Sequence, residues 1–285
     1  MIDTHAHLHF PDFDADRAAV ISRAFAFGIT GIVEISVAPG AWAEVLRLAQ
    51  ADPRIFAALG VHPHEAAAAT PGALRRMERR LADPGVVAVG ETGLDRVRGF
   101  SSHEDQRRAL IAQIGIARES GLPLVIHCRE AFDELIPLLA REGGAAIRGV
   151  FHCFSGGVAE AQAVTARGFL VGLGGAVTYA PERWRPVLAA LPREAILLET
   201  DAPFLRPAPD RRGRNEPALL LRTAEAIAPD LGMTCSELVA LADANARRFF
   251  GLSAPGAAVE SAADGDVAAE RSASGSAAPD SPERS

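Results

Sequence analysis

The chain has 285 residues, of which 48% are hydrophobic and 23% charged, a composition typical of a globular protein with one large or two ordinary domains. No apolar run reaches the roughly 18 residues of a membrane span, and the N-terminus lacks the basic and apolar regions of a signal peptide. The net charge is −7, of which −4 belongs to the last 32 residues, so the nearly neutral remainder does not indicate broad electrostatic binding of nucleic acid.

Two residue types limit the chemistry and the compartment. All 29 basic residues are arginines, and the absence of lysine excludes Schiff-base chemistry, a lysine general base and a metal site bridged by a carbamylated lysine. The three cysteines show no close pairing, which favours a reducing compartment over a disulfide framework. We therefore expect a cytoplasmic protein.

The first predicted element is a strand over residues 1–7, "MIDTHAH". His5 and His7 are two residues apart, so on a strand their imidazoles point the same way and can chelate one ion. His9 falls where the strand should turn into a loop, and we leave it out of the predicted site. Asp3 and the interrupting apolar residues argue against a purification tag.

Seven more short apolar runs follow, separated by segments of helical pattern. The predicted strands cover residues 29–36, 54–61, 86–91, 122–128, 147–153, 168–174 and 195–200. Helical periodicity is clearest over 103–120, where Ser101 and Glu104 form a predicted capping box, and Thr234 and Glu237 repeat that signature before 238–250. Strands alternating with helices indicate parallel pairing, and eight such units predict an α/β fold of the (β/α)8 TIM-barrel class.

The competing architecture is a doubly wound open sheet, which usually has a nucleotide-binding glycine loop after its first strand. That position holds "HLHFPDF", and the sequence contains no GxGxxG, P-loop, GxSxG or CxxC motif. We therefore predict a barrel domain over residues 1–253. Residues 254–285, rich in Ala, Ser and acidic residues, are predicted to form a disordered tail.

Histidines and acidic residues gather at the C-terminal ends of the predicted strands, which is where a barrel of this class places its active site. The candidate metal ligands are His5, His7, Glu91, His127, His152 and Asp201. Imidazole and carboxylate groups suit zinc, manganese and related divalent ions. Six ligands are too many for one site with an open position, so we predict two divalent ions bridged by the carboxylate of Glu91, which lies on the fourth strand.

Seven ordered motifs resemble the TatD family of metal-dependent deoxyribonucleases, within the amidohydrolase-like barrels. They are "DTHAHL", "GVHPH", "GETGLD", "VIHCRE", "FHCFSG", "ETDAPFL" and "RNEP", and the resemblance covers about residues 1–252. It implies one ion on His5, His7 and Asp201, a second on His127 and His152, and Glu91 between them. It also implies a two-metal hydrolase of ester bonds that cleaves DNA, as a 3′–5′ exonuclease on single strands or ends.

The mechanism predicted from the sequence makes Asp201 the general base and adds Glu91 and His62 as catalytic groups. Substrate contacts are predicted for His62, His64, Arg129, Arg214, Asn215 and Glu216. A structural role is the alternative for Arg129, and for Glu216 as an anchor of Arg214 or of a loop amide. The metal is Mg, Mn or Zn, the partner is DNA as substrate, and we infer no membrane and no obligate protein partner.

One departure from the family pattern concerns the residues after "GLD", where members usually carry aromatic side chains. This chain has Arg96 and Val97 there, which removes a stacking surface for a base. Arg96 could contact a phosphate or stack by its plane instead.

Two alternative functions remain open at this stage. One is hydrolysis of a small ester, lactone, amide or phosphotriester by the same metal centre, since a fold does not fix a function. The other is a non-catalytic binding protein that keeps the metal site as a staple, against which the complete acid–base set argues.

Overall fold

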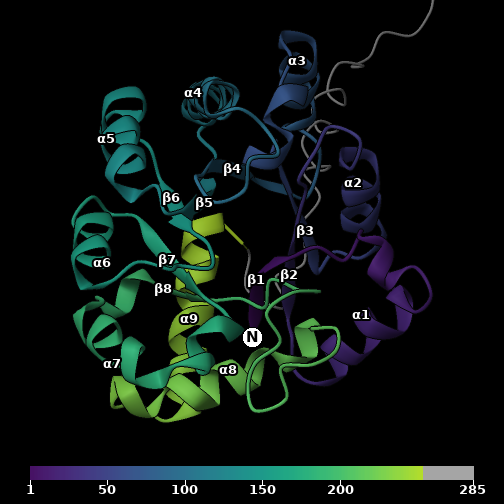
Figure 1. Cartoon of the computed structure of the whole chain (residues 1–285). Coiled ribbons are helices and arrows are strands. Elements are labelled where there is room, and N and C mark those ends of the chain that lie inside the picture. Colours follow the sequence, from purple (N-terminus) through teal and green to yellow (C-terminus); the bar gives the residue numbers. More distant parts are fainter. Residues whose placement is uncertain (253–285) are drawn as a thin grey trace, which may run out of the picture. The chain divides into compact units, whose positions relative to one another are not determined.

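A computed structural model describes residues 1–252 and shows eight parallel strands in sequential order around a barrel (Figure 1). The strands are β1 Ile2–Ala6, β2 Gly31–Ile35, β3 Ile55–Leu59, β4 Val86–Asp95, β5 Leu124–Arg129, β6 Gly149–Phe151, β7 Leu170–Leu173 and β8 Ile196–Leu198. The predicted (β/α)8 class is thus confirmed. The predicted disordered tail, residues 254–285, lies outside the described residues.

The fourth strand is longer than predicted. The expected strand ended at Glu91, whereas β4 continues to Asp95 because its last residues pair with the end of β5. Gly93 lies opposite His127, and Asp95 lies opposite Arg129. The extension therefore carries Asp95 to the same end of the barrel as His127.

Helices alternate with the strands throughout the described part of the chain. They are α1 Arg17–Ala26, α2 Trp42–Ala51, α3 Pro71–Arg80, α4 His103–Ser120, α5 Phe132–Gly143, α6 Val158–Thr165, α7 Pro181–Ala190, α8 Leu220–Ile227 and α9 Cys235–Phe250. Figure 1 shows α1 to α8 as an outer ring around the strands, with α9 drawn next to β8. No helix among residues 1–252 is long and apolar enough to cross a membrane.

The two predicted capping boxes have different outcomes. Thr234 and Glu237 form the predicted reciprocal pair at the start of α9. The prediction for α4 was wrong by one residue, because Ser102 is the cap and accepts a hydrogen bond from the Asp105 amide. Ser101 instead donates its hydroxyl to the carbonyl of His64 at 2.8 Å and ties two loops together.

The barrel closes through hydrogen bonds that β1 makes with the segment after β8. The Asp201 amide donates to the His5 carbonyl at 2.9 Å, and the His7 amide donates to the Ala202 carbonyl at 2.8 Å. The buried Asp3 carboxylate accepts hydrogen bonds from the Thr200 amide and hydroxyl. This closure places Asp201 beside the two histidines of β1.

Candidate functional site

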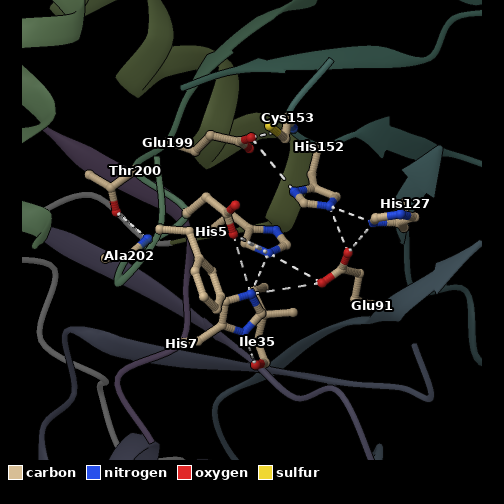
Figure 2. Close-up of polar contacts among 12 residues, drawn as sticks. His5, His7, Ile35, Glu91, His127, His152, Cys153, Glu199, Thr200 and Ala202 are labelled. Atoms are coloured by element: carbon tan, nitrogen blue, oxygen red, sulfur yellow. Dashed lines mark hydrogen bonds and ion pairs between the residues drawn. The ribbon is translucent and has the colours of Figure 1, made fainter. Parts of the chain in front are cut away.

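The six predicted metal ligands converge at the C-terminal ends of the strands. Figure 2 shows Glu91 between His5 and His7 on one side and His127 and His152 on the other. Four of the six side chains are almost fully buried, and those of Asp201 and His127 are 12% and 16% exposed. Because buried charged groups require partners, a cluster of this kind must be held by mutual contacts or by a bound ion.

The first group of ligands comes from β1 and from the segment after β8. The Nε2 atoms of His5 and His7 lie 3.1 Å apart, as expected for two side chains on one face of a strand. The Oδ1 atom of Asp201 lies 3.6 Å from Nε2 of His5 and 3.4 Å from Nε2 of His7. Asp201 has a φ of +56°, a left-handed conformation that is strained for a non-glycine residue.

The second group comes from β5 and from the residue after β6. Oε1 of Glu91 lies 2.9 Å from Nδ1 of His127 and 2.6 Å from Nε2 of His152. The rings of His152 and His5 stack with their centroids 3.9 Å apart, so the two groups of predicted ligands are in direct contact.

Glu91 divides its two oxygen atoms between the groups. Oε1 faces His127 and His152, whereas Oε2 lies 3.4 Å from Nε2 of His5 and 3.8 Å from Nε2 of His7. Burial favours the neutral acid, but the charge of His152 and the hydrogen bonds from His127 and His152 hold the pKa of Glu91 well below its usual range. The two oxygen atoms of this carboxylate therefore face two separate groups of histidines.

The electrostatics of the cluster also attract positive charge. Burial opposes protonation of His7, but the hydrogen bond with Asp201 and the charges of Asp201 and Glu91 outweigh it and raise the pKa of His7 to about 9. Burial likewise opposes protonation of His127, whose pKa is raised to about 9 by Asp95 and Glu91. The cluster therefore stabilises cations beside its carboxylates.

Hydrogen bonds to the outer ring nitrogens orient two of the histidines. Nδ1 of His7 donates to the carbonyl of Ile35 at 2.8 Å, which leaves Nε2 for the cluster. Nε2 of His127 is 3.2 Å from Oδ2 of Asp95, which leaves Nδ1. Outer partners of this kind fix the tautomer of a metal-binding histidine.

His62 is oriented in the opposite sense. Its Nδ1 accepts a hydrogen bond from the His64 amide at 3.0 Å, and so the proton of its neutral ring is on Nε2. This atom lies 3.3 Å from Oε1 of Glu91. Burial lowers the pKa of His62 to about 4, so the ring is neutral near pH 7. His62 thus presents an N–H donor to the cluster, whereas Nε2 of His7 and Nδ1 of His127 can each offer a lone pair once a bound cation replaces the proton there.

The donor set fits divalent ions. Three sets of ligand atoms, each within 4.8 Å of one another, contain only the predicted ligands, and they are His5–His7–Glu91, His5–His152–Asp201 and Glu91–His127–His152. Nδ1 of His5 and Nδ1 of His152 are buried without a hydrogen-bond partner among the described residues. Neutral imidazole and carboxylate atoms at this spacing are the donors that zinc and manganese accept.

The sequence reasoning missed Asp95, which supports the second group from outside. Its Oδ2 accepts from Nε2 of His64 at 2.8 Å and of His127 at 3.2 Å, and its Oδ1 accepts from the Val97 and Arg98 amides. Although burial opposes ionisation, the bond from His127 and the backbone bonds hold the pKa of Asp95 below its usual range. Asp95 is the last residue of the motif "GETGLD", and its place in that motif was the sequence signal that could have identified it.

Glu199 is a second missed residue, and it lies behind His152. Its Oε1 accepts the Cys153 amide and is 3.8 Å from Nδ1 of His152. Burial raises the pKa of Glu199 to about 8. A Cβ at Gly172 would collide with this carboxylate, so a side chain there would displace Glu199. An acid inside the apolar run "AILLET" was the signal, because buried acids are rare without partners.

His9, which the sequence analysis left out, has a structural contact. Its Nδ1 lies 2.6 Å from Oε1 of the buried Glu34, which also accepts the Leu8 and His9 amides. Glu34 therefore anchors the loop that follows β1.

The other residues predicted to contact the substrate lie outside the group of six predicted ligands. His64 lies at the rim with its Nε2 on Asp95, and Arg129 is exposed at the end of β5. Arg214 pairs with Asp16 at 2.7 Å, and Glu216 pairs with Arg23 at 2.6 Å. These two ion pairs join the loop after β8 to α1.

Asn215 is buried within the same loop. Its side-chain amide donates to the carbonyls of Thr200 and Phe204 at 2.8 and 2.7 Å. These bonds hold the segment that carries Asp201, and they commit the amide hydrogens of Asn215 to the protein.

Arg96 also pairs with protein groups. Its guanidinium contacts Asp133 at 3.1 Å and Glu134 at 2.8 Å, and both acids belong to the start of α5. The residue that replaces the usual aromatic therefore joins the loop after β4 to α5, while Val97 is exposed.

Known proteins resemble the chain over its described length. A family model described as "TatD related DNase" matches residues 2–251. The chain is 38% identical over 265 residues to the "3'-5' ssDNA/RNA exonuclease TatD" of Escherichia fergusonii, with 89% of this chain and 100% of the relative covered. It is 35% identical over 251 residues to the "Uncharacterized metal-dependent hydrolase YabD" of Bacillus subtilis, with 88% and 98% covered.

A solved structure agrees with these matches. The structure of YJJV, a TatD homolog from Escherichia coli K12, has a TM-score of 0.84 and 31% identity to this chain, and the match covers 89% of this chain and 98% of that one.

Proposed function

Because the chain belongs to the TatD family of metal-dependent hydrolases, we propose that it hydrolyses phosphodiester bonds of DNA and removes nucleotides from the 3′ ends of single strands. A relative at 38% identity is named as a single-stranded DNA and RNA exonuclease of that polarity. The observation that carries the proposal is the position of Glu91, whose two oxygen atoms face two separate groups of histidines.

The proposed centre holds two divalent ions, which are Mg, Mn or Zn. His5, His7 and Asp201 would hold one ion, His127 and His152 the other, and Glu91 would contact both. Bound ions of this kind supply Lewis acidity, which lowers the pKa of water and neutralises charge on a phosphate.

The side chains of the protein would then position and move protons. Asp201 is the proposed general base, because its hydrogen bond from His7 outweighs its burial and lowers the pKa of the carboxyl group below its usual value, so that it is an acceptor at neutral pH. His62 is the proposed donor to a phosphate or leaving-group oxygen, because its N–H on Nε2 faces the cluster.

The remaining predicted contacts are assigned by their positions. His64 and Arg129 lie at the rim of the site and are proposed to contact the DNA strand. Arg214, Asn215 and Glu216 are proposed to shape the substrate side of the site through the loop after β8, which their hydrogen bonds hold in place. The free thiols of Cys128, Cys153 and Cys235 agree with the proposed cytoplasmic location.

The test is an assay of a 3′-labelled single-stranded oligonucleotide with Mg, Mn and Zn in turn, beside a panel of small esters, lactones and amides. We expect release of 3′ nucleotides that stops with EDTA and returns with added metal. Turnover of a small ester without cleavage of DNA would support the alternative hydrolase instead.

Glu91→Ala is the control for the two-ion centre. The variant should fold, as judged by circular dichroism, and should lose turnover by about a thousandfold or more. Full activity in a folded Glu91→Ala protein would contradict the two-ion proposal.

A further inference from the structure

An open groove lies beside the metal centre, on the side of His127. It is formed between the loop after β4 and the 3₁₀ turn η2, Pro63–Ala68, and has a volume of about 530 Å³. Its walls are His64, Glu65, Ala67, Ala68, Phe100 and Ser101. Sites for small organic groups are commonly apolar concavities of this size with a few polar atoms.

Phe100 supplies an exposed aromatic face in this groove. The side chain is 68% exposed, which is unusual for a phenylalanine, and its ring meets that of His64 edge to face at 4.9 Å between centroids. An exposed ring beside an active site offers a surface on which a base can stack, whatever its sequence.

The loop that carries Phe100 is held in place. The Ser101 hydroxyl donates to the His64 carbonyl at 2.8 Å, and Gln106 donates to the Ser101 carbonyl at 3.2 Å. The side-chain oxygen of Gln106 also accepts the Asp95 amide. The ring therefore sits on a preorganised support, which reduces the entropy that binding must overcome.

One carboxylate connects the groove with the metal centre. Oδ2 of Asp95 contacts both His64, which lines the groove, and His127, which belongs to the proposed ligand set. The rings of His64 and His127 are 6.0 Å apart between centroids. A strand with a phosphate at the centre can therefore place a neighbouring base in the groove.

The charge of the groove favours a base over a phosphate. Glu65 lines it, and within residues 1–252 the Glu65 carboxylate has no hydrogen-bond or ion-pair partner. None of the lining residues is an arginine. A free carboxylate repels phosphate, whereas it accepts hydrogen bonds from the amino and imino groups of a base edge.

We propose that this groove is a nucleobase subsite, in which an unpaired base of the substrate strand stacks on Phe100 with its polar edge toward Glu65. The inference rests on the proposed function and extends it. Phe100 supplies the stacking surface that Arg96 and Val97 do not provide, but from a position farther along the loop.

The test compares Phe100→Ala and Phe100→Tyr with Phe27→Ala. Phe27 is the matched control, because it is 65% exposed but lies at the end of α1, where the chain turns toward the N-terminal end of β2. Single-stranded oligonucleotides carry one 2-aminopurine or one abasic residue at successive positions from the 3′ end. Emission and anisotropy are measured in EDTA, and KM and kcat with metal.

We expect binding to quench 2-aminopurine at one position in the wild-type, Phe100→Tyr and Phe27→Ala proteins, and Phe100→Ala to remove that quenching. Phe100→Ala should raise KM about 10-fold with little change in kcat. An abasic residue at that position should weaken wild-type binding equally and add nothing to the loss in Phe100→Ala.

A wild-type protein that cleaves the oligonucleotide while Phe100→Ala matches Phe27→Ala in KM and emission would overturn the subsite alone. The absence of a position-dependent quench in the wild-type protein would do the same. A wild-type protein that neither binds nor cleaves DNA would overturn the proposed function as well.

Discussion

The two ends of the barrel carry opposite kinds of side chain. At the C-terminal ends of the strands, histidines and carboxylates are buried against one another around Glu91. The apolar residues inside the barrel, among them Ile2 and Val87 near the strand starts, instead pack with Phe249 and Phe250 at the end of α9. Burial of polar and charged side chains at the C-terminal end thus costs folding free energy but creates a site that attracts cations. Burial of apolar side chains at the other end contributes to stability.

Substitutions at the two ends of the barrel should therefore affect activity and stability separately. Changes among the histidines should alter catalysis or metal binding in a folded protein. Changes at the end of α9 should lower stability without altering the chemistry of the folded fraction. Substitutions at each end can test this division.

The sharpest test within the metal end compares His127→Ala with His62→Ala. Both should lower kcat, His62→Ala by about 10²–10³-fold as expected for loss of a positioned hydrogen-bond donor. Only His127→Ala should lower the amount of bound metal, because Nε2 of His62 carries a proton and offers no lone pair. Metal content by mass spectrometry after dialysis measures the difference, and equal metal loss in both variants would show that His62 is a ligand.

Phe250→Ala tests the opposite end. The side chain is 6% exposed and packs edge to face on Phe249 at 4.7 Å. Its truncation should lower the free energy of unfolding by about 3 kcal/mol through lost burial and a cavity. Urea denaturation measures this, with Phe27→Ala as a control that should change stability by about 0.5 kcal/mol or less. A loss of metal affinity in folded Phe250→Ala would break the division between the two ends.

Asp95→Asn tests whether the hydrogen bonds of Asp95 orient His127 for metal binding. An amide has one acceptor oxygen in place of two, so it cannot accept the four hydrogen bonds that Asp95 receives with its two oxygens. We expect metal affinity to fall by about 10–100-fold, as for other outer partners of ligand histidines. Isothermal titration calorimetry with Zn or Mn measures it, and an unchanged affinity would mean that His127 needs no such orientation.

Asp16→Asn should have the smallest effect, since it removes a surface ion pair. The hydrogen bond from Arg214 lowers the pKa of Asp16. A lowered folded-state pKa adds stability that is present above the unfolded value of about 4 and is lost as the pH falls through the folded value. The Tm difference between the two proteins should therefore be measurable at pH 6 and shrink below about pH 4. A difference independent of pH would assign the effect to packing.

Local patterns were sufficient for the outline of the fold. Apolar runs of strand length, separated by helical periodicity, led to eight parallel strands, because each element must bury one face at a fixed spacing. The strand boundaries were less certain. Val86–Asp95 continues four residues past the predicted end because it pairs with β5, and a partner strand is not visible in local sequence.

The ligand candidates could also be proposed from the sequence, since strand ends in a barrel converge whatever lies between them. The roles of their neighbours could not. Arg214 and Glu216 share a motif with Asn215, yet their charges are paired with Asp16, which precedes α1, and with Arg23 of α1. Pairing over such separations follows from packing, which no local pattern records.

The amino-acid sequence was enough to predict the barrel class, the alignment of His5 with His7 and the set of candidate ligands, because strand periodicity and residue chemistry are local properties. That Glu91 directs one oxygen to each group of histidines is visible only in the folded barrel. The folded barrel also shows that His62 directs an N–H on Nε2 to the cluster, that His127 directs its Nδ1 there, and that Phe100 stands exposed beside them. These features depend on distances and hydrogen bonds between distant segments, and those exist only once the barrel has closed.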